Sequence, residues 1–114
     1  MRIYLSGKMS SLPDLNKPKF EKYEALLVAK GHEVINPHKI NFPDTMELTW
    51  ENYMKEDLKH MLNCDMVAAL DDWKESKGAL VEIQLARDLN IPVVNVDTFQ
   101  PIRISRKEIE FEEN

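Results

Sequence analysis

Two acidic residues occupy positions where the helical pattern of the sequence is otherwise apolar. Between Trp50 and Leu62, seven positions at helical spacing should face a core; six are apolar and the seventh is Asp57. In a second such stretch, Glu82 falls on the same face as Ile83. An unpaired acid buried in a core is costly. Acids held at a cleft are therefore candidates for general acid–base or nucleophilic catalysis.

Glu82 lies about one turn after the expected start of its helix, where the helix dipole favours a negative charge. We therefore expect its carboxylate to be ionised at neutral pH. The ordinary alternative is that Asp57 and Glu82 each cap a helix, pair with a lysine or lie at the edge of an apolar stripe. Two such acids near one predicted ligand-binding edge favour a functional site.

Weaker candidates are polar residues that follow the predicted strands. Ser76 and Gly78 open a helix with free backbone N–H groups that suit a phosphate, and on spacing alone a serine that only caps its helix is the simpler interpretation. Lys8 and Ser10 could hold an anion or belong to an ordinary loop. His38 follows a strand and could reach a ligand.

The elements that would position these residues alternate along the chain. We expect strands at 2–6, 33–36, 65–70 and 92–96, separated by helices at 17–30, 50–63 and 77–90. This order predicts an α/β fold in one domain, residues 1–98, with a Rossmann-like (flavodoxin-like) parallel sheet of four to five strands and helices on both faces. A short edge strand at 102–105 or a tail would complete residues 99–114. Ligands of such sheets bind beyond the carboxyl ends of the strands, so loops 7–15, 37–48 and 71–76 are expected to form the site.

The composition limits the classes of partner and cofactor. The 114-residue chain carries a net charge of −5, which argues against binding to long nucleic acid. Its single cysteine, Cys64, cannot form an internal disulfide, and its three histidines lack metal-ligand spacing. The sequence holds neither a P-loop nor a G-x-G-x-x-G pattern, so we expect no cofactor and no metal. Without a secretory leader or an apolar run of membrane length, we expect a cytoplasmic protein with no membrane partner.

Short motifs spread over residues 2–96 resemble those of an enzyme family. They are Ile3–Gly7, Asp57–Leu58 followed by Asp65, and Ser76-x-Gly78-x-x-x-Glu82 followed by Ala86 and Pro92–Val93. Their order and spacing resemble nucleoside 2-deoxyribosyltransferases and 2'-deoxynucleoside 5'-phosphate N-hydrolases, in particular a small branch of that superfamily found in phages and bacteria.

The resemblance implies cleavage of an N-glycosidic bond through a covalent glycosyl intermediate, by hydrolysis or by transfer to a second base. Glu82 would attack C1' of the deoxyribosyl group, Asp57 would assist proton transfer at the leaving base, and Tyr4 would hydrogen-bond near Glu82. The residues implied to bind the substrate are Ser6, Gly7, Lys8, Ser10, His38, Ser76 and Gly78. The partner would be a small deoxynucleoside or deoxynucleotide, and the protein would be a homo-oligomer.

Two positions bear on the 5' end of the substrate. Ser76 stands where the transferases carry an acid for a free 5'-hydroxyl and where the monophosphate hydrolases carry a serine, which favours a 5'-monophosphate. Ser10 stands where the hydrolases carry an arginine, and Lys8 is the alternative cation. Two other interpretations stay open. One is a non-catalytic nucleotide-binding sensor of Rossmann-like fold, and the other is an interaction protein without a ligand.

Overall fold

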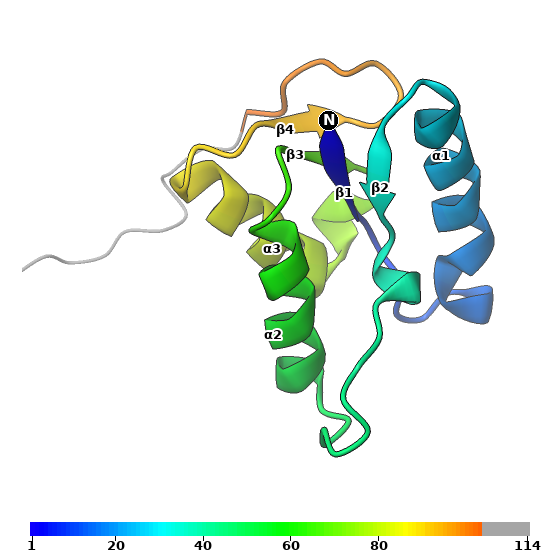
Figure 1. Ribbon diagram of the computed structural model, residues 1–114, viewed down its shortest axis with the longest axis vertical. Helices are drawn as coiled ribbons and strands as arrows, with labels where there is room; N and C mark the ends of the chain where they lie inside the picture. The colour runs from blue at the N-terminus through cyan, green and yellow to red at the C-terminus, as the bar shows by residue number, and fades with distance from the viewer. Residues whose placement is uncertain (104–114) are drawn as a thin grey trace, which may run out of the picture.

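Four parallel strands form the centre of the computed structural model, which describes residues 1–103. They are β1 (Arg2–Ser6), β2 (Glu33–Ile35), β3 (Met66–Ala69) and β4 (Val93–Asn95), in the order β2-β1-β3-β4 (Figure 1). The register sets Ile3 of β1 against Val34 of β2 on one side and Met66 of β3 on the other. The predicted parallel sheet is confirmed.

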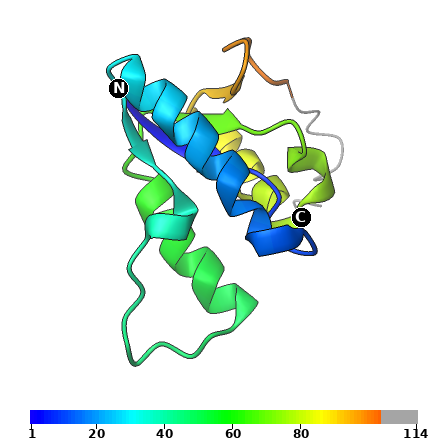
Figure 2. The same cartoon turned by 90° about the vertical axis from the view of Figure 1, so that its right-hand side faces the viewer.

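Helices cover both faces of the sheet. α1 (Lys17–Ala29) packs on one face, and α2 (Trp50–Met61) and α3 (Lys77–Asp88) pack on the other (Figure 2). The apolar spacing explains this arrangement, because α1 buries Phe20, Tyr23 and Leu27, and α3 buries Ala79, Ile83 and Ala86. Three short 3-10 turns lie in the connections, η1 (Pro13–Asn16), η2 (Pro37–Lys39) and η3 (Trp73–Glu75).

The crossovers make the gap between β1 and β3 the switch point of the sheet. The chain leaves β1 through α1 towards β2 on one side, and leaves β3 through α3 towards β4 on the other. Two neighbouring parallel strands therefore send their following loops apart at their carboxyl ends, and this leaves a crevice at the edge of the sheet. The segments that border it are residues 7–16, 36–49 and 70–76.

The chain after β4 folds back along that strand. Pro101 forms an isolated antiparallel bridge with Val94, and the backbone N–H of Ile102 donates to the carbonyl of Val93 at 2.9 Å. Pairing thus occurs at Pro101, just before the expected edge strand at 102–105. The rest of that strand and the expected tail lie outside the described residues. Within residues 1–103, no helix combines the length and apolar character needed to cross a membrane.

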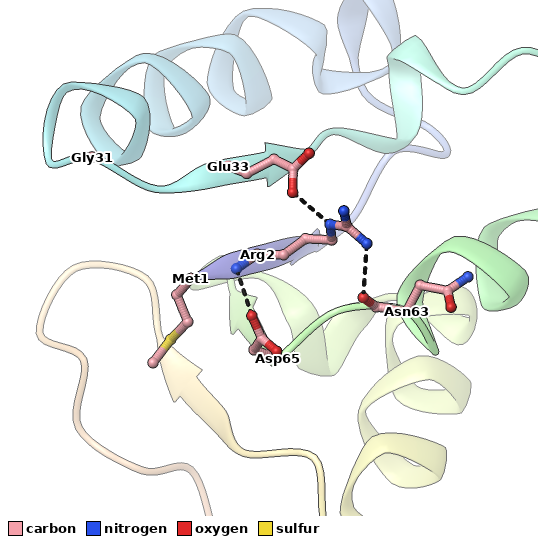
Figure 3. A pocket seen from close by; sticks show the side chains of 6 residues that line it. All are labelled: Met1, Arg2, Gly31, Glu33, Asn63 and Asp65. Atoms are coloured by element: carbon pink, nitrogen blue, oxygen red, sulfur yellow. Dashed lines mark hydrogen bonds and ion pairs between the residues drawn. The ribbon is translucent and has the colours of Figure 1, made fainter.

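At the amino ends of the strands, Arg2 makes polar contacts with three neighbouring residues. Arg2 of β1 lines a pocket of about 350 Å³. Figure 3 shows Arg2 between Glu33, Asn63 and Asp65. Its backbone N–H donates to Asp65 at 2.8 Å, its Nε pairs with Glu33 at 2.5 Å, and a terminal nitrogen donates to the carbonyl of Asn63 at 3.3 Å. These contacts tie the starts of β1, β2 and β3 together, so we assign this pocket a structural role.

Candidate active site

Glu82 projects from the second turn of α3 against the end of β1. The Tyr4 hydroxyl donates to its Oε2 at 2.5 Å and the Ser6 hydroxyl donates to its Oε1 at 2.8 Å. Tyr4 and Ser6 are buried and belong to the same face of β1, because they are two residues apart on a strand. The carboxyl group is therefore held at both oxygens by side chains from the sheet.

Burial dominates the ionisation of Glu82. Burial raises the pKa of the carboxyl, the hydrogen bonds from Tyr4 and Ser6 lower it, and the nearby charge of Asp57 adds to the rise, so that the pKa is about 8. This raised pKa runs against the expectation from the sequence that Glu82 is ionised at neutral pH. Burial also raises the pKa of Tyr4 well above its usual value, with the charge of Glu82 adding to it, so this phenol stays a donor.

Asp57 is the second buried acid of the site. It lies in the middle of α2 with 5% of its surface exposed, and its Oδ1 has no hydrogen-bond partner in the described part of the chain. Burial raises the pKa of this carboxyl to about 7, with the charge of Glu56 adding to it. A buried acceptor without a partner is rare in folded proteins, so it points to a group supplied from outside.

Asp57 and Glu82 share one cavity of about 420 Å³ at the carboxyl edge of the sheet. The size suits a small organic ligand. Its wall is mixed, with aromatic and aliphatic side chains beside a few polar groups. The residues that line it are Gly7, Met9, Ser10, Leu15, Pro37, His38, Phe42, Trp50, Tyr53, Met54, Asp57, Ser76, Gly78, Ala79 and Glu82.

Asp72 holds the loop after β1 in place over this cavity. Its Oδ1 accepts the backbone N–H of Lys8 at 2.9 Å, and its Oδ2 accepts the side chain of Asn16 at 3.1 Å and that of Lys19 at 3.2 Å. Asn16 also donates to the carbonyl of Lys8 at 2.8 Å. The loop is therefore fixed from β3 and α1, which positions Gly7 and Ser10 at the cavity wall.

Gly7 is required by the close packing of β1 against the end of β3. A Cβ at this position would lie 2.8 Å from the Cβ of Leu70 and 3.1 Å from Oδ1 of Asp72. We expect Gly7→Ala to lower the free energy of unfolding by roughly 1–3 kcal/mol, the usual cost of overpacking. Urea unfolding measures it. Gly31→Ala gives the comparison for backbone strain without overpacking, because a Cβ there meets no atom within 4 Å and its cost comes from a φ of 92°. Equal stability of Gly7→Ala and the wild type would contradict the packing argument.

The polar candidates from the sequence divide into three groups in the structure. Ser10, His38, Ser76 and Gly78 line the cavity together with Gly7. Tyr4 and Ser6 lie behind Glu82 and contact it directly. Lys8 is not among the residues that line the cavity, and its backbone N–H and carbonyl are bound to Asp72 and Asn16.

Ser76 has the capping role that its spacing suggested, because its Oγ accepts the backbone N–H of Ala79 at 3.1 Å. A hydroxyl that accepts one hydrogen bond still has its own proton to donate. Ser76 therefore caps α3 and remains able to donate to a ligand in the cavity that it lines.

The sequence also matches a family of known proteins. Residues 1–95 match the family described as domain of unknown function DUF4406. The chain belongs to this family. Among curated proteins, none matches the DUF4406 chain.

Solved structures similar to this DUF4406 domain include three enzymes. The first is a 2-deoxyribosyltransferase from Bacillus psychrosaccharolyticus, at 24% identity and a TM-score of 0.66, over 83% of this chain and 71% of that one. The second is a CMP N-glycosidase from Clostridium botulinum, at 21% identity and a TM-score of 0.56, over 83% of this chain and 67% of that one. The third is a 2-deoxyribosyltransferase from Leishmania mexicana, at 18% identity and a TM-score of 0.63, over 82% of this chain and 62% of that one. These likenesses show that the DUF4406 domain has the same fold as those enzymes.

Several lining residues of the DUF4406 domain were not foreseen as part of a site. Trp50 and Tyr53 were expected on the core side of their helix, but they are 39% and 36% exposed and line the cavity. Phe42 packs edge-to-face on Tyr53, with ring centroids 4.8 Å apart. Lys77 lies over the Trp50 ring. The sequence did contain one indication that Lys77 lies near the site, because it stands between Ser76 and Gly78, two residues already considered as ligand-binding.

Residues 1–103 contain no group of three or more histidine, cysteine, aspartate or glutamate side chains that could hold a metal ion. Cys64 is buried, and burial raises the pKa of its thiol to about 11. Asp57 and Glu82 are the two carboxyl groups among the residues that line the cavity.

Proposed function

We propose that this protein cleaves the N-glycosidic bond of a 2'-deoxynucleoside 5'-monophosphate, or of the nucleoside, with Glu82 as nucleophile. The observation that carries the proposal is the pairing of two buried acids in one cavity, one held by Tyr4 and Ser6 and one with a free acceptor. The shared fold with deoxyribosyltransferases and a CMP N-glycosidase supports it.

In the proposed reaction, an oxygen of the ionised Glu82 forms a bond to C1' while the bond from C1' to the base nitrogen breaks. The electron pair of that bond goes to the base, which takes a proton from Asp57. Water, or a second base in a transfer reaction, then attacks C1' and releases Glu82, with Asp57 accepting the proton. The raised pKa of Asp57, about 7, suits a group that gives and takes a proton near neutral pH.

The aromatic and aliphatic part of the wall suits the base of the substrate. Trp50, Tyr53 and Phe42 offer ring surfaces, and base–aromatic stacking tolerates different bases. Ser10, His38 and Ser76 supply polar groups around them. The cavity therefore combines an apolar platform with few polar contacts, as small-molecule sites commonly do.

A panel of deoxynucleosides and their 5'-monophosphates tests the proposal directly. Each is incubated with the protein, and the released base is measured by chromatography. Release of base from at least one compound is the expected result. Binding without release would instead support a nucleotide sensor, and neither binding nor release would support an interaction protein without a ligand.

Tyr4→Phe tests how the sheet tunes the nucleophile. Removing the phenol removes a hydrogen bond that lowers the pKa of Glu82, so less of the carboxylate is ionised at pH 7. We expect base release to fall about tenfold at pH 7, and the deficit to shrink as the pH rises past 8. A pH profile of base release for both proteins measures this. A deficit of the same size at every pH would mean that Tyr4 is only structural.

A further inference from the structure

Lys77 places a positive charge next to Trp50, a residue of the cavity wall. It is the first residue of α3, and its Nζ lies 4.1 Å from the centre of the Trp50 ring, which lines the cavity. A lysine side chain is long and flexible, and a cation over an aromatic face is attracted by the ring quadrupole. Trp50 therefore holds the ammonium group of an exposed side chain near the cavity mouth.

The start of α3 adds donors at the same place. The first N–H groups of a helix have no acceptor within it and carry the positive end of the helix dipole. Ser76 accepts one of them, from Ala79, and keeps its own proton to donate. Ser76 and Gly78 both line the cavity on either side of Lys77 in the sequence. An anion at this position would meet the cation, the hydroxyl and the backbone donors together.

An independent observation shows that the cavity is arranged for a ligand. Asp57 is 5% exposed, lines the same cavity and leaves Oδ1 without a partner in the described part of the chain. A ligand that gives a donor to Asp57 and an anion to the start of α3 would satisfy both. A sugar phosphate with a base attached has groups of both kinds at opposite ends.

We infer that Lys77, positioned by Trp50, recognises the 5'-phosphate of the substrate and makes this protein prefer a nucleoside monophosphate over a nucleoside. The inference rests on the proposed function and assigns its phosphate contact. The backbone N–H of Lys8, the cation considered from the sequence, is bound to Asp72, whereas the ammonium group of Lys77 lies over Trp50, which lines the cavity. The positive charge that binds the phosphate is thus supplied by the first residue of α3.

The experiment compares affinities in matched lysine variants. The four 2'-deoxynucleoside 5'-monophosphates and their nucleosides are titrated calorimetrically into wild type, Lys77→Gln, Lys77→Arg and Lys74→Gln. Lys74 is the control, because it is exposed and its Nζ lies 5.5 Å from the centre of the Trp73 ring, which is not among the residues that line the cavity. Base release is measured by chromatography in the same samples.

We expect Lys77→Gln to reduce the preference for monophosphate over nucleoside about tenfold, the size of one charge-assisted hydrogen bond. Lys77→Arg should keep most of the preference, Lys74→Gln should keep all of it, and added salt should weaken it in the wild type. Equal affinities in the wild type, or a preference that survives Lys77→Gln, would overturn the inference. A preference that depends on Lys77 without any base release would overturn the N-glycosidase proposal and uphold the phosphate contact.

Discussion

Glu82→Gln should reduce base release by roughly a thousandfold or more while the chain stays folded. The reason is chemical, since a carboxylate oxygen can form the bond to C1' and an amide of the same shape cannot replace it. The cavity also allows the amide to be accommodated. Its oxygen can accept one of the two hydroxyls of Tyr4 and Ser6, and its NH₂ can donate to the other.

The control for this variant is Glu75→Gln, which removes the same charge from an exposed residue before α3. Base release, thermal melting and circular dichroism are measured for both variants. A folded Glu82→Gln protein that releases base at the wild-type rate would end the assignment of the nucleophile. A purely structural Glu82 predicts a different pattern, in which the loss of activity follows a loss of roughly 1–3 kcal/mol in the free energy of unfolding, the cost of leaving a buried hydroxyl of Tyr4 or Ser6 unsatisfied.

The sheet and both acids could be predicted from the sequence because each depends on local periodicity. Strands and helices followed from the apolar spacing, and Asp57 and Glu82 stood out because they break an apolar helix face. The topology then placed the two helices on the same face of the sheet, which brought the acids into one cavity. Periodicity identifies which face of a helix is buried, and the rules for connecting parallel strands determine on which side of the sheet that helix lies.

Other features depend on distances that periodicity does not contain. Trp50 and Tyr53 follow the same stripe as Met61, but the first turns of α2 extend past the edge of the sheet, so their rings border a cavity and Met61 is fully buried (Figure 1). The contact of Lys77 with Trp50 joins two different helices and needs the packing of α2 on α3.

The ionisation of Glu82 shows how a local rule loses to a tertiary effect. A helix dipole contributes typically 0.3–1 kcal/mol to an exposed anion, which is less than one pH unit of pKa shift. Burial of the whole carboxyl raises the pKa from 4.5 to about 8, which is several times larger. The position near the helix start was visible in the sequence, but the depth of burial beneath Tyr4 and Ser6 was not.

The stability of the protein should fall as the pH rises from about 5 to 8. Glu82 and Asp57 have folded-state pKa values of about 8 and about 7, above their ordinary values of 4.5 and 3.8. Between those limits the folded state keeps a proton that the unfolded state has released. The stabilisation is complete below the ordinary pKa of each acid and is lost as the pH rises to the folded value. Within the window, each acid lowers the free energy of unfolding by about 1.4 kcal/mol per pH unit.

Urea unfolding at several pH values measures this slope in wild type, Glu82→Gln, Asp57→Asn and Glu75→Gln. In Glu82→Gln and in Asp57→Asn, the free energy of unfolding should fall less steeply with pH, by about 1.4 kcal/mol per pH unit for the one acid removed. Glu75→Gln should keep the wild-type slope. Glu82→Gln should therefore gain stability relative to the wild type as the pH rises from 5 to 8. His38 acts in the opposite direction near its ordinary pKa of 6.5, because burial lowers its pKa, but it is present in every variant and cancels in the comparison. A Glu82→Gln protein with the full wild-type slope would mean that Glu82 is already ionised in the fold, as the sequence alone suggested, and its burial would then have to be offset by contacts stronger than those with Tyr4 and Ser6.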